Sequence, residues 1–99
     1  MHVVVNHLRF SSAPPQSAID AIHGEAGDRL RTIDGFRSVQ FCRVDDEHFI
    51  LIVQADSPDA LGRISQEVGG PWVTEHLAPH FAAPPDRSVA EVVAAAHAG

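Results

Sequence analysis

The sequence contains no lysine and no tyrosine, and its only cysteine is Cys42. Without lysine the chain cannot form a Schiff base on a lysine amine, and without tyrosine it lacks a common phenolic acid. A single cysteine allows neither an internal disulfide nor a metal site built from several cysteines. On a strand, Cys42 is expected to be a small buried residue rather than a nucleophile.

Long apolar runs and clustered cations are also missing. No stretch approaches about 18 consecutive apolar residues, so we expect no membrane span and no membrane partner. The first residues lack the basic region and long apolar stretch of a signal peptide, which predicts a cytoplasmic protein. The formal net charge is −6, and the seven cations, all arginine, are scattered along the chain. Because phosphate binding needs clustered cations, nucleic acid is not an expected partner.

The motifs of several enzyme classes are absent as well. The sequence has no phosphate-binding loop, no dinucleotide-binding fingerprint and no nucleophile elbow. What remains is a chain of 99 residues, 44% hydrophobic and 20% charged, which is typical of an ordinary globular protein. This length predicts a single domain over residues 1–99, with a frayed tail from about residue 94.

The hydrophobic pattern predicts four strands and two helices. Strands are expected over residues 3–10, 36–44, 48–54 and 88–93; helices are expected over 15–33 and from Ser57 to about Leu77, with an interruption at Gly69-Gly70-Pro71. The order is β-α-β-β-α-β, the ferredoxin-like α+β unit, in which an antiparallel sheet carries both helices on one face. The segment 49–53 is apolar throughout, so we expect it to be a central strand buried on both sides.

The sheet face opposite the helices is expected to bind a second copy of the chain. Both alternating faces of the first strand begin with apolar residues, which indicates that both are covered. A domain of this size buries only about two thirds of its unfolded surface, so an uncovered apolar face is a natural dimer surface. We therefore expect a homodimer that forms through the sheet face.

Asn6 is the first candidate functional residue, because it interrupts an apolar face. Val4, Leu8 and Phe10 share that face, which the helices are expected to cover. A buried carboxamide without hydrogen-bond partners costs about 1–3 kcal/mol. Two interpretations remain open: Asn6 bonds a helix end or a buried water in the core, or it orients the polar edge of a ligand in a pocket.

A second candidate is the ridge formed by Trp72, His76 and His80. Helical spacing places these residues beside a core ridge that consists of Val73, Leu77 and Phe81. Trp72 is then either a core anchor with surface histidines beside it or one wall of a cavity under the helix. In the second interpretation His76 serves as an acid/base or as an axial ligand, since imidazole changes charge near neutral pH.

His76 and His80 also have the H-x-x-x-H spacing that lets two histidines share a metal ion. No glutamate follows the first histidine, no third ligand is apparent, and Pro79 disturbs the helix between them. We therefore expect no native metal site.

Four landmarks resemble the antibiotic-biosynthesis-monooxygenase family of dimeric α+β barrel proteins. They are Val3-Val4-Val5-Asn6-His7-Leu8, Ile33-Asp34-Gly35-Phe36, Asp56-Ser57-Pro58-Asp59-Ala60-Leu61 and Trp72-Val73-Thr74-Glu75-His76. The resemblance covers nearly the whole chain. It implies dimerisation through the sheets and a pocket between sheet and helices in each subunit.

The resemblance also implies a choice of chemistry, because some family members oxidise aromatic polyketides without metal or flavin, one branch binds and degrades haem, and many have no known activity. Haem-degrading members use an asparagine on the first strand and a histidine near the end of the second helix, which Asn6 and His76 match by position. They also use a tryptophan in that helix, and the corresponding stretch Ile64-Ser65-Gln66 has none. The common tryptophan at the end of the third strand is replaced by Gln54.

The leading expectation is cofactor-independent oxidation of an aromatic, quinol-like molecule by O₂. The substrate anion would give an electron directly to O₂, so the protein need only desolvate, orient and deprotonate it. His76 is the expected base and Asn6 the polar anchor. The expected pocket walls are Val4, Leu8, Phe10, Phe41, Ile64, Trp72 and His80.

Two alternatives compete with this expectation. One is haem binding, with His76 as axial ligand and Arg9, Arg31 or Arg63 at the propionates. The other is a dimer without catalytic activity that binds a ligand or a partner protein, with Asn6 satisfied in the core. The three readings share one fold, and a fold alone does not choose among them.

Overall fold

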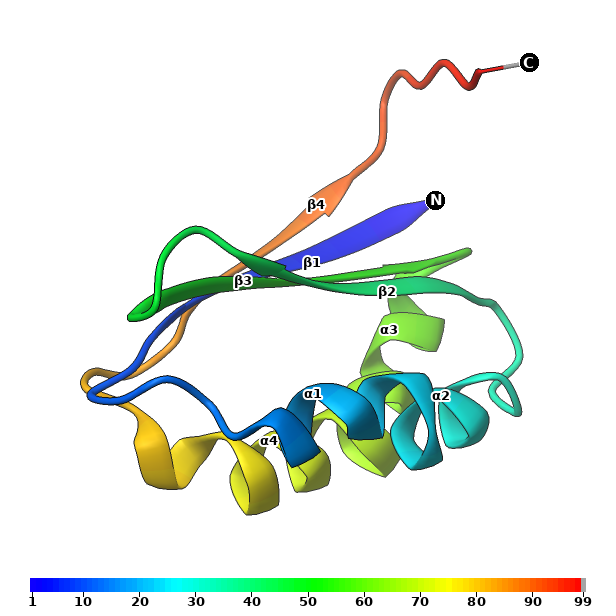
Figure 1. Ribbon diagram of the computed structural model, residues 1–99. Helices are drawn as coiled ribbons and strands as arrows, with labels where there is room; N and C mark the ends of the chain where they lie inside the picture. The colour runs from blue at the N-terminus through cyan, green and yellow to red at the C-terminus, as the bar shows by residue number, and fades with distance from the viewer. Residues whose placement is uncertain (99) are drawn as a thin grey trace.

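The computed structural model describes residues 1–98, so Gly99, the end of the expected tail, lies outside the described residues. One antiparallel sheet has the strand order β2-β3-β1-β4, and the helices lie together on one of its faces (Figure 1). The β-α-β-β-α-β order expected from the sequence is confirmed. The strands are β1 (His2–Arg9), β2 (Phe36–Arg43), β3 (His48–Ala55) and β4 (Asp86–Glu91).

Strand β3 is central, as expected, but it is not buried on both sides. Its residues alternate between half-exposed and buried along the whole strand, from His48 to Ala55. The reason is that the helices cover one face of the sheet and leave the other to solvent in a single copy (Figure 1). The last strand also begins at Asp86, two residues earlier than expected.

The first helical segment consists of two helices where the periodicity predicts one. Helix α1 (Gln16–His23) ends and α2 (Glu25–Leu30) begins at Gly24, whose backbone angles (φ −100°, ψ −108°) lie outside the helical region. A regular hydrophobic stripe does not reveal such a break, because both helices keep their apolar residues toward the sheet. Helix α2 ends at Leu30, three residues before the expected end at Ile33. Gly35, in the turn that follows, has a φ of 87°, a conformation that suits glycine.

The second helical segment is continuous where the sequence predicts an interruption. Helix α3 (Pro58–Ile64) begins at Ser57, whose side chain accepts a hydrogen bond from the Ala60 N–H at 3.2 Å. It passes into the π-helical segment η1 (Ser65–Gly69) and then into α4 (Gly70–His76). A short 3₁₀ turn, η2 (Ala78–His80), follows.

The π-helical segment explains how the chain passes Gly69-Gly70-Pro71 without a break. The Gly70 N–H donates to the Ser65 carbonyl, five residues back, which is the π-helical pattern. A Cβ on Gly70 would lie 2.8 Å from that carbonyl oxygen, so the close approach depends on glycine. Pro71 has no N–H to donate, and the Glu67 carbonyl four residues before it accepts a hydrogen bond from the Arg29 guanidinium at 2.8 Å.

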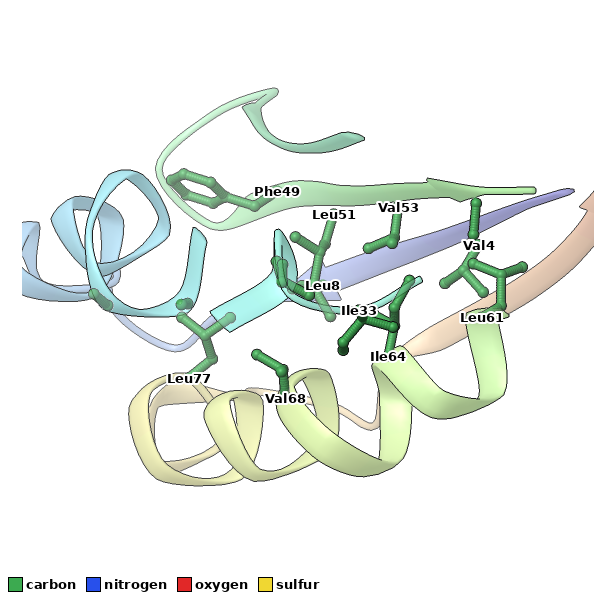
Figure 2. Packing of buried hydrophobic residues seen from close by; sticks show 14 of the residues in the cluster. Val4, Leu8, Ile33, Phe49, Leu51, Val53, Leu61, Ile64, Val68 and Leu77 are labelled. Carbon is green, nitrogen blue, oxygen red and sulfur yellow. The ribbon is translucent and has the colours of Figure 1, made fainter. Parts of the chain in front are cut away.

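The hydrophobic core lies between the sheet and the helices (Figure 2). Leu77, at the end of α4, and Leu8, on β1, are almost completely buried and belong to one cluster with the central strands. Phe10 extends this core beyond β1 through a bridge to Phe81. None of the helices in residues 1–98 is long and apolar enough to cross a membrane.

Candidate functional site

A cavity of about 280 Å³ lies between the inner sheet face and the α3–η1–α4 segment. Its walls are largely apolar, and its volume is close to the lower end of the range for ligand sites, roughly 300–1,000 Å³. The lining residues are Val4, Asn6, Leu8, Leu51, Val53, Leu61, Ile64, Ser65, Gly69, Gly70, Val73, Thr74, Pro85 and Arg87.

Asn6 and Arg87 form the polar edge of this cavity. They are directly opposite each other in the register between β1 and β4, so their side chains point to the same face of the sheet. Within residues 1–98 the Asn6 carboxamide makes no side-chain hydrogen bond, and Arg87 has no ion pair. Asn6 is half-exposed and Arg87 is exposed, so both donor groups can be reached from solvent as well as from the cavity. A ligand in the apolar cavity could therefore be held by one polar end at this edge.

The π-helical segment forms the opposite wall. Ser65, Gly69 and Gly70 line the cavity, and the two glycines present backbone rather than side chain to it. Thr74, one turn further along α4, adds a hydroxyl. Single π-helical turns are frequent at functional sites because they widen a helix locally.

The structure brings four of the expected pocket residues together. Asn6, Val4 and Leu8 approach the cavity from β1, and Ile64 approaches it from the end of α3. The alternation of β1 places the first three on one face, as expected.

Phe10 and Phe41 lie elsewhere. Phe10 is 2% exposed and packs edge-to-face on Phe49, with ring centroids 5.4 Å apart, so it belongs to the core. Phe41 also packs on Phe49, in a stacked arrangement with ring centroids 4.9 Å apart. It lines an open groove between β2 and the helices α1 and α2 instead of the cavity beside Asn6.

Trp72, His76 and His80 are also outside the lining of the cavity. Trp72 lines a separate apolar space of about 40 Å³, and its buried indole N–H has no partner among the described residues. The His76 ring lies 5.6 Å from the Trp72 ring, and its Nε2 atom is 3.9 Å from a carboxylate oxygen of Glu75. The His80 backbone carbonyl accepts a hydrogen bond from the Ser11 N–H at 2.8 Å.

Sequence reasoning missed Arg87, Ser65 and Thr74. Arg87 lies one residue before the strand that the sequence predicts over residues 88–93. The signal that finds Arg87 is the strand register opposite Asn6, which requires the pairing partner to be known. Within residues 1–98, no group of three or more histidine, cysteine, aspartate or glutamate side chains is placed to hold a metal ion.

The fold and cavity together define a ferredoxin-like α+β protein with a ligand-sized space under the second helical segment. Across almost the whole chain, the structures that resemble it include antibiotic biosynthesis monooxygenases, so the expected fold resemblance is confirmed.

Three solved structures illustrate this similarity. A putative antibiotic biosynthesis monooxygenase from Nitrosomonas europaea matches 95% of this chain and 100% of its own, with a TM-score of 0.77 and 11% identity. SnoaB, a cofactor-independent oxygenase from Streptomyces nogalater, matches 95% of this chain and 94% of its own, with a TM-score of 0.71 and 16% identity. A variant of MhuD with two manganese protoporphyrin IX molecules per active site matches 99% and 100%, with a TM-score of 0.70 and 15% identity.

No family model matches the chain, and no curated protein sequence is significantly similar to it. At identities of 11–16% the similarity concerns the fold, since one fold hosts many functions.

Proposed function

We propose that this protein oxidises a small phenolic or quinol-like molecule with O₂ in the cavity beside Asn6 and Arg87. The observation that carries the proposal is the pair of unpartnered donors on one edge of an otherwise apolar space. The apolar walls would hold the rings, and the polar edge would hold the oxygen substituent. SnoaB, which has the same fold, is a cofactor-independent oxygenase, and this supports the type of reaction.

Arg87 supplies the charge that this chemistry needs. A guanidinium beside a bound phenol favours the phenolate and so lowers the pKa of the substrate. The Asn6 carboxamide donates a hydrogen bond to the same oxygen and fixes the orientation of the ring. The proton leaves to water or to a base outside the lining, for which His76 stays the prediction from the sequence.

The reaction balances without a cofactor from the protein. The phenolate gives one electron to O₂, and the resulting radical and superoxide combine at the carbon para to the oxygen, which in this substrate carries a hydrogen. The hydroperoxide then loses water and leaves a quinone carbonyl. One oxygen atom of O₂ enters the product, the other leaves as water, and the ring loses two hydrogen atoms. The apolar walls restrict water around these intermediates.

Haem does not fit this cavity. Haem iron is held by histidine, cysteine, methionine or tyrosine side chains, and among the described residues none of these lines the cavity. Its volume of about 280 Å³ also favours a molecule of one to three rings over a porphyrin. The cavity of this chain therefore does not support the binding of a porphyrin such as the one bound by the MhuD variant.

We also propose that the protein works as a homodimer through the outer sheet face. This face is uncovered in a single copy, although β1 and β3 place apolar residues on it. On β4, the residues opposite Val3 and Val5 are Ala90 and Ser88, and both are exposed on this face. Burial of such surface against a second copy would stabilise the assembly by the ordinary hydrophobic effect.

The test of the activity is oxygen uptake with dihydroxynaphthalene, measured for the wild type and for three variants. We expect Arg87→Met to lower the rate at least tenfold and Arg87→Lys to retain more of it, because lysine keeps the charge. His76→Ala, compared side by side, decides the prediction for that residue: an unchanged rate removes His76 as the base.

The alternative of a binding protein without catalytic activity makes a different forecast. It predicts saturable binding of dihydroxynaphthalene with no enzyme-dependent oxygen uptake. A wild-type protein that neither binds this molecule nor consumes oxygen in its presence would contradict both the oxidation and the proposed ligand class.

A further inference from the structure

A pair of histidines lies on the sheet face opposite the helices. The Nδ1 atom of His7 on β1 is 3.0 Å from the Nε2 atom of His48 on β3, and the pair is partly buried. The two ring centroids are 5.3 Å apart, close to the largest separation that this nitrogen–nitrogen distance permits. The imidazoles therefore meet end-on, as in a hydrogen bond.

An end-on pair of imidazoles holds one proton between its two facing nitrogens. A neutral imidazole has one donor and one acceptor, whereas the charged ring has two donors and no acceptor. The bond between His7 and His48 is therefore compatible with a neutral pair or with a single positive charge. When both rings are charged, two N–H groups oppose each other, like charges lie side by side and the bond is lost.

The neighbouring strands place few other titratable groups on this face. Arg9 is opposite His48 in the β1–β3 register, and Asp86 is opposite His7 in the β1–β4 register. From β2, Cys42 is opposite Ile50 and so lies on the same face. The helices lie on the other face and contribute no charge here (Figure 1). Arg9 and Asp86 thus flank the pair, and the Asp45 carboxylate in the turn before β3 accepts a hydrogen bond from the His48 backbone N–H at 2.8 Å.

The same face suits a second copy of this chain. Around the histidines it carries apolar side chains that are half-exposed in a single copy: Val3, Val5, Ile50 and Ile52. Because a twofold dimer interface is self-complementary, the exposed Arg9 and Asp86 of one copy offer opposite charges to those of the other.

We propose that two copies associate through this face only while the His7–His48 pair is uncharged or singly charged, so that acidification separates them. This inference rests on the dimer proposed above. Association would place the pair between two sheets, and burial disfavours the charged form of histidine.

The net charge of the protein would change dimerisation with pH in the opposite direction to the histidine pair. The formal net charge of −6 becomes less negative as histidines take up protons below neutral pH. General repulsion between two acidic copies therefore weakens on acidification, which alone would favour association. A dimer that weakens as the pH falls consequently points to specific groups within the interface.

Sedimentation equilibrium of the full chain at about pH 8 and about pH 6 tests the proposal, since histidine changes charge across this interval. We expect the dissociation constant to rise about tenfold on acidification in the wild type. In the double variant His7→Gln/His48→Gln we expect no rise, because glutamine keeps a hydrogen bond without titrating. The control is His23→Gln, whose histidine lies at the end of α1 and lines the groove beside β2.

Each outcome bears on the proposal. A tenfold rise that the double variant abolishes and His23→Gln retains supports it. A dimer with equal affinity at both pH values overturns the switch and leaves the dimer. A monomer at both pH values overturns the switch together with the dimer, while oxygen uptake still tests the cavity. If the double variant unfolds, His7→Gln alone, checked by circular dichroism, must still reduce the pH dependence.

Discussion

At the scale of single residues, we expect Asn6 and Arg87 to contribute to ligand binding much more than to the stability of the fold. Both line an apolar cavity, and neither has a side-chain hydrogen bond or ion pair within the described part of the chain. A polar group without a protein partner contributes little to the free energy of unfolding. A ligand that pairs with it gains the interaction instead.

We predict that Asn6→Leu leaves the free energy of unfolding unchanged or raises it by about 1 kcal/mol, since asparagine is poorly suited to a strand interior. The same change should abolish saturable binding of dihydroxynaphthalene. Urea denaturation and a binding titration on one preparation measure both effects. A loss of more than about 1 kcal/mol would show that Asn6 is satisfied in the core, the bland interpretation of its position.

Leu77, in contrast to Asn6 and Arg87, is expected to contribute to stability and not to ligand binding. It is 0% exposed and lies where the end of α4 meets the core (Figure 2). We predict that Leu77→Ala lowers the free energy of unfolding by about 2–5 kcal/mol, because it removes buried contacts and leaves a cavity. The matched control is Val44→Ala at a position 56% exposed, which should change it by less than about 0.5 kcal/mol. Similar losses in both variants would contradict the assigned core.

The positions of single site residues could be predicted from the sequence only within one strand, from the alternation of inward and outward side chains. The period of two along β1 placed Val4, Asn6 and Leu8 on the inner face. It could not supply Arg87, because that residue enters the site through pairing with a strand about 80 positions away. Helical spacing grouped Trp72 with His76, and their rings do lie together, but spacing does not say which neighbouring space they face.

At the scale of elements, the π-helical segment η1 is the feature that shapes the cavity. It carries the chain past Pro71 without a break and places Ser65, Gly69 and Gly70 on the cavity wall. From the sequence, two glycines and a proline indicate an interruption, because propensities describe α-helix and not the wider π turn. The break at Gly24 was missed for the converse reason, as the apolar stripe continues across it.

Two glycines of this segment provide a matched test. A Cβ on Gly70 would lie 2.8 Å from the Ser65 carbonyl oxygen, whereas nothing lies within 4 Å of a Cβ on Gly62 in α3. We predict that Gly70→Ala costs about 1–3 kcal/mol in stability and that Gly62→Ala adds about 0.5–1 kcal/mol. Thermal unfolding of the two variants measures the difference. Equal melting temperatures would contradict the close backbone approach.

At the scale of the whole molecule, the two faces of the sheet have different roles. The inner face and helices enclose the core and the cavity, while the outer face carries half-exposed apolar residues and the His7–His48 pair. The element order and the central position of β3 followed from sequence pattern alone. The pattern also predicts that the outer face is buried by a second copy, and this stays a prediction, because a single chain cannot display the contribution of a second copy.

We predict that the chain sediments as a dimer at micromolar concentration near pH 8. Val5→Asp, a change on the outer face of β1, should shift the protein to monomer because it buries a charge in the interface. Glu75→Ala, an exposed change on α4, should leave the dimer intact. A wild-type monomer would contradict the assigned interface.

The central claim, a phenol-binding cavity with Arg87 at its polar edge, is tested most directly by titration calorimetry with dihydroxynaphthalene. The account predicts one saturable site per chain, at least tenfold weaker in Arg87→Met and unchanged in Arg63→Met, where the arginine lies on the exposed side of α3. Equal weakening in both variants, or no binding by the wild type, would contradict it.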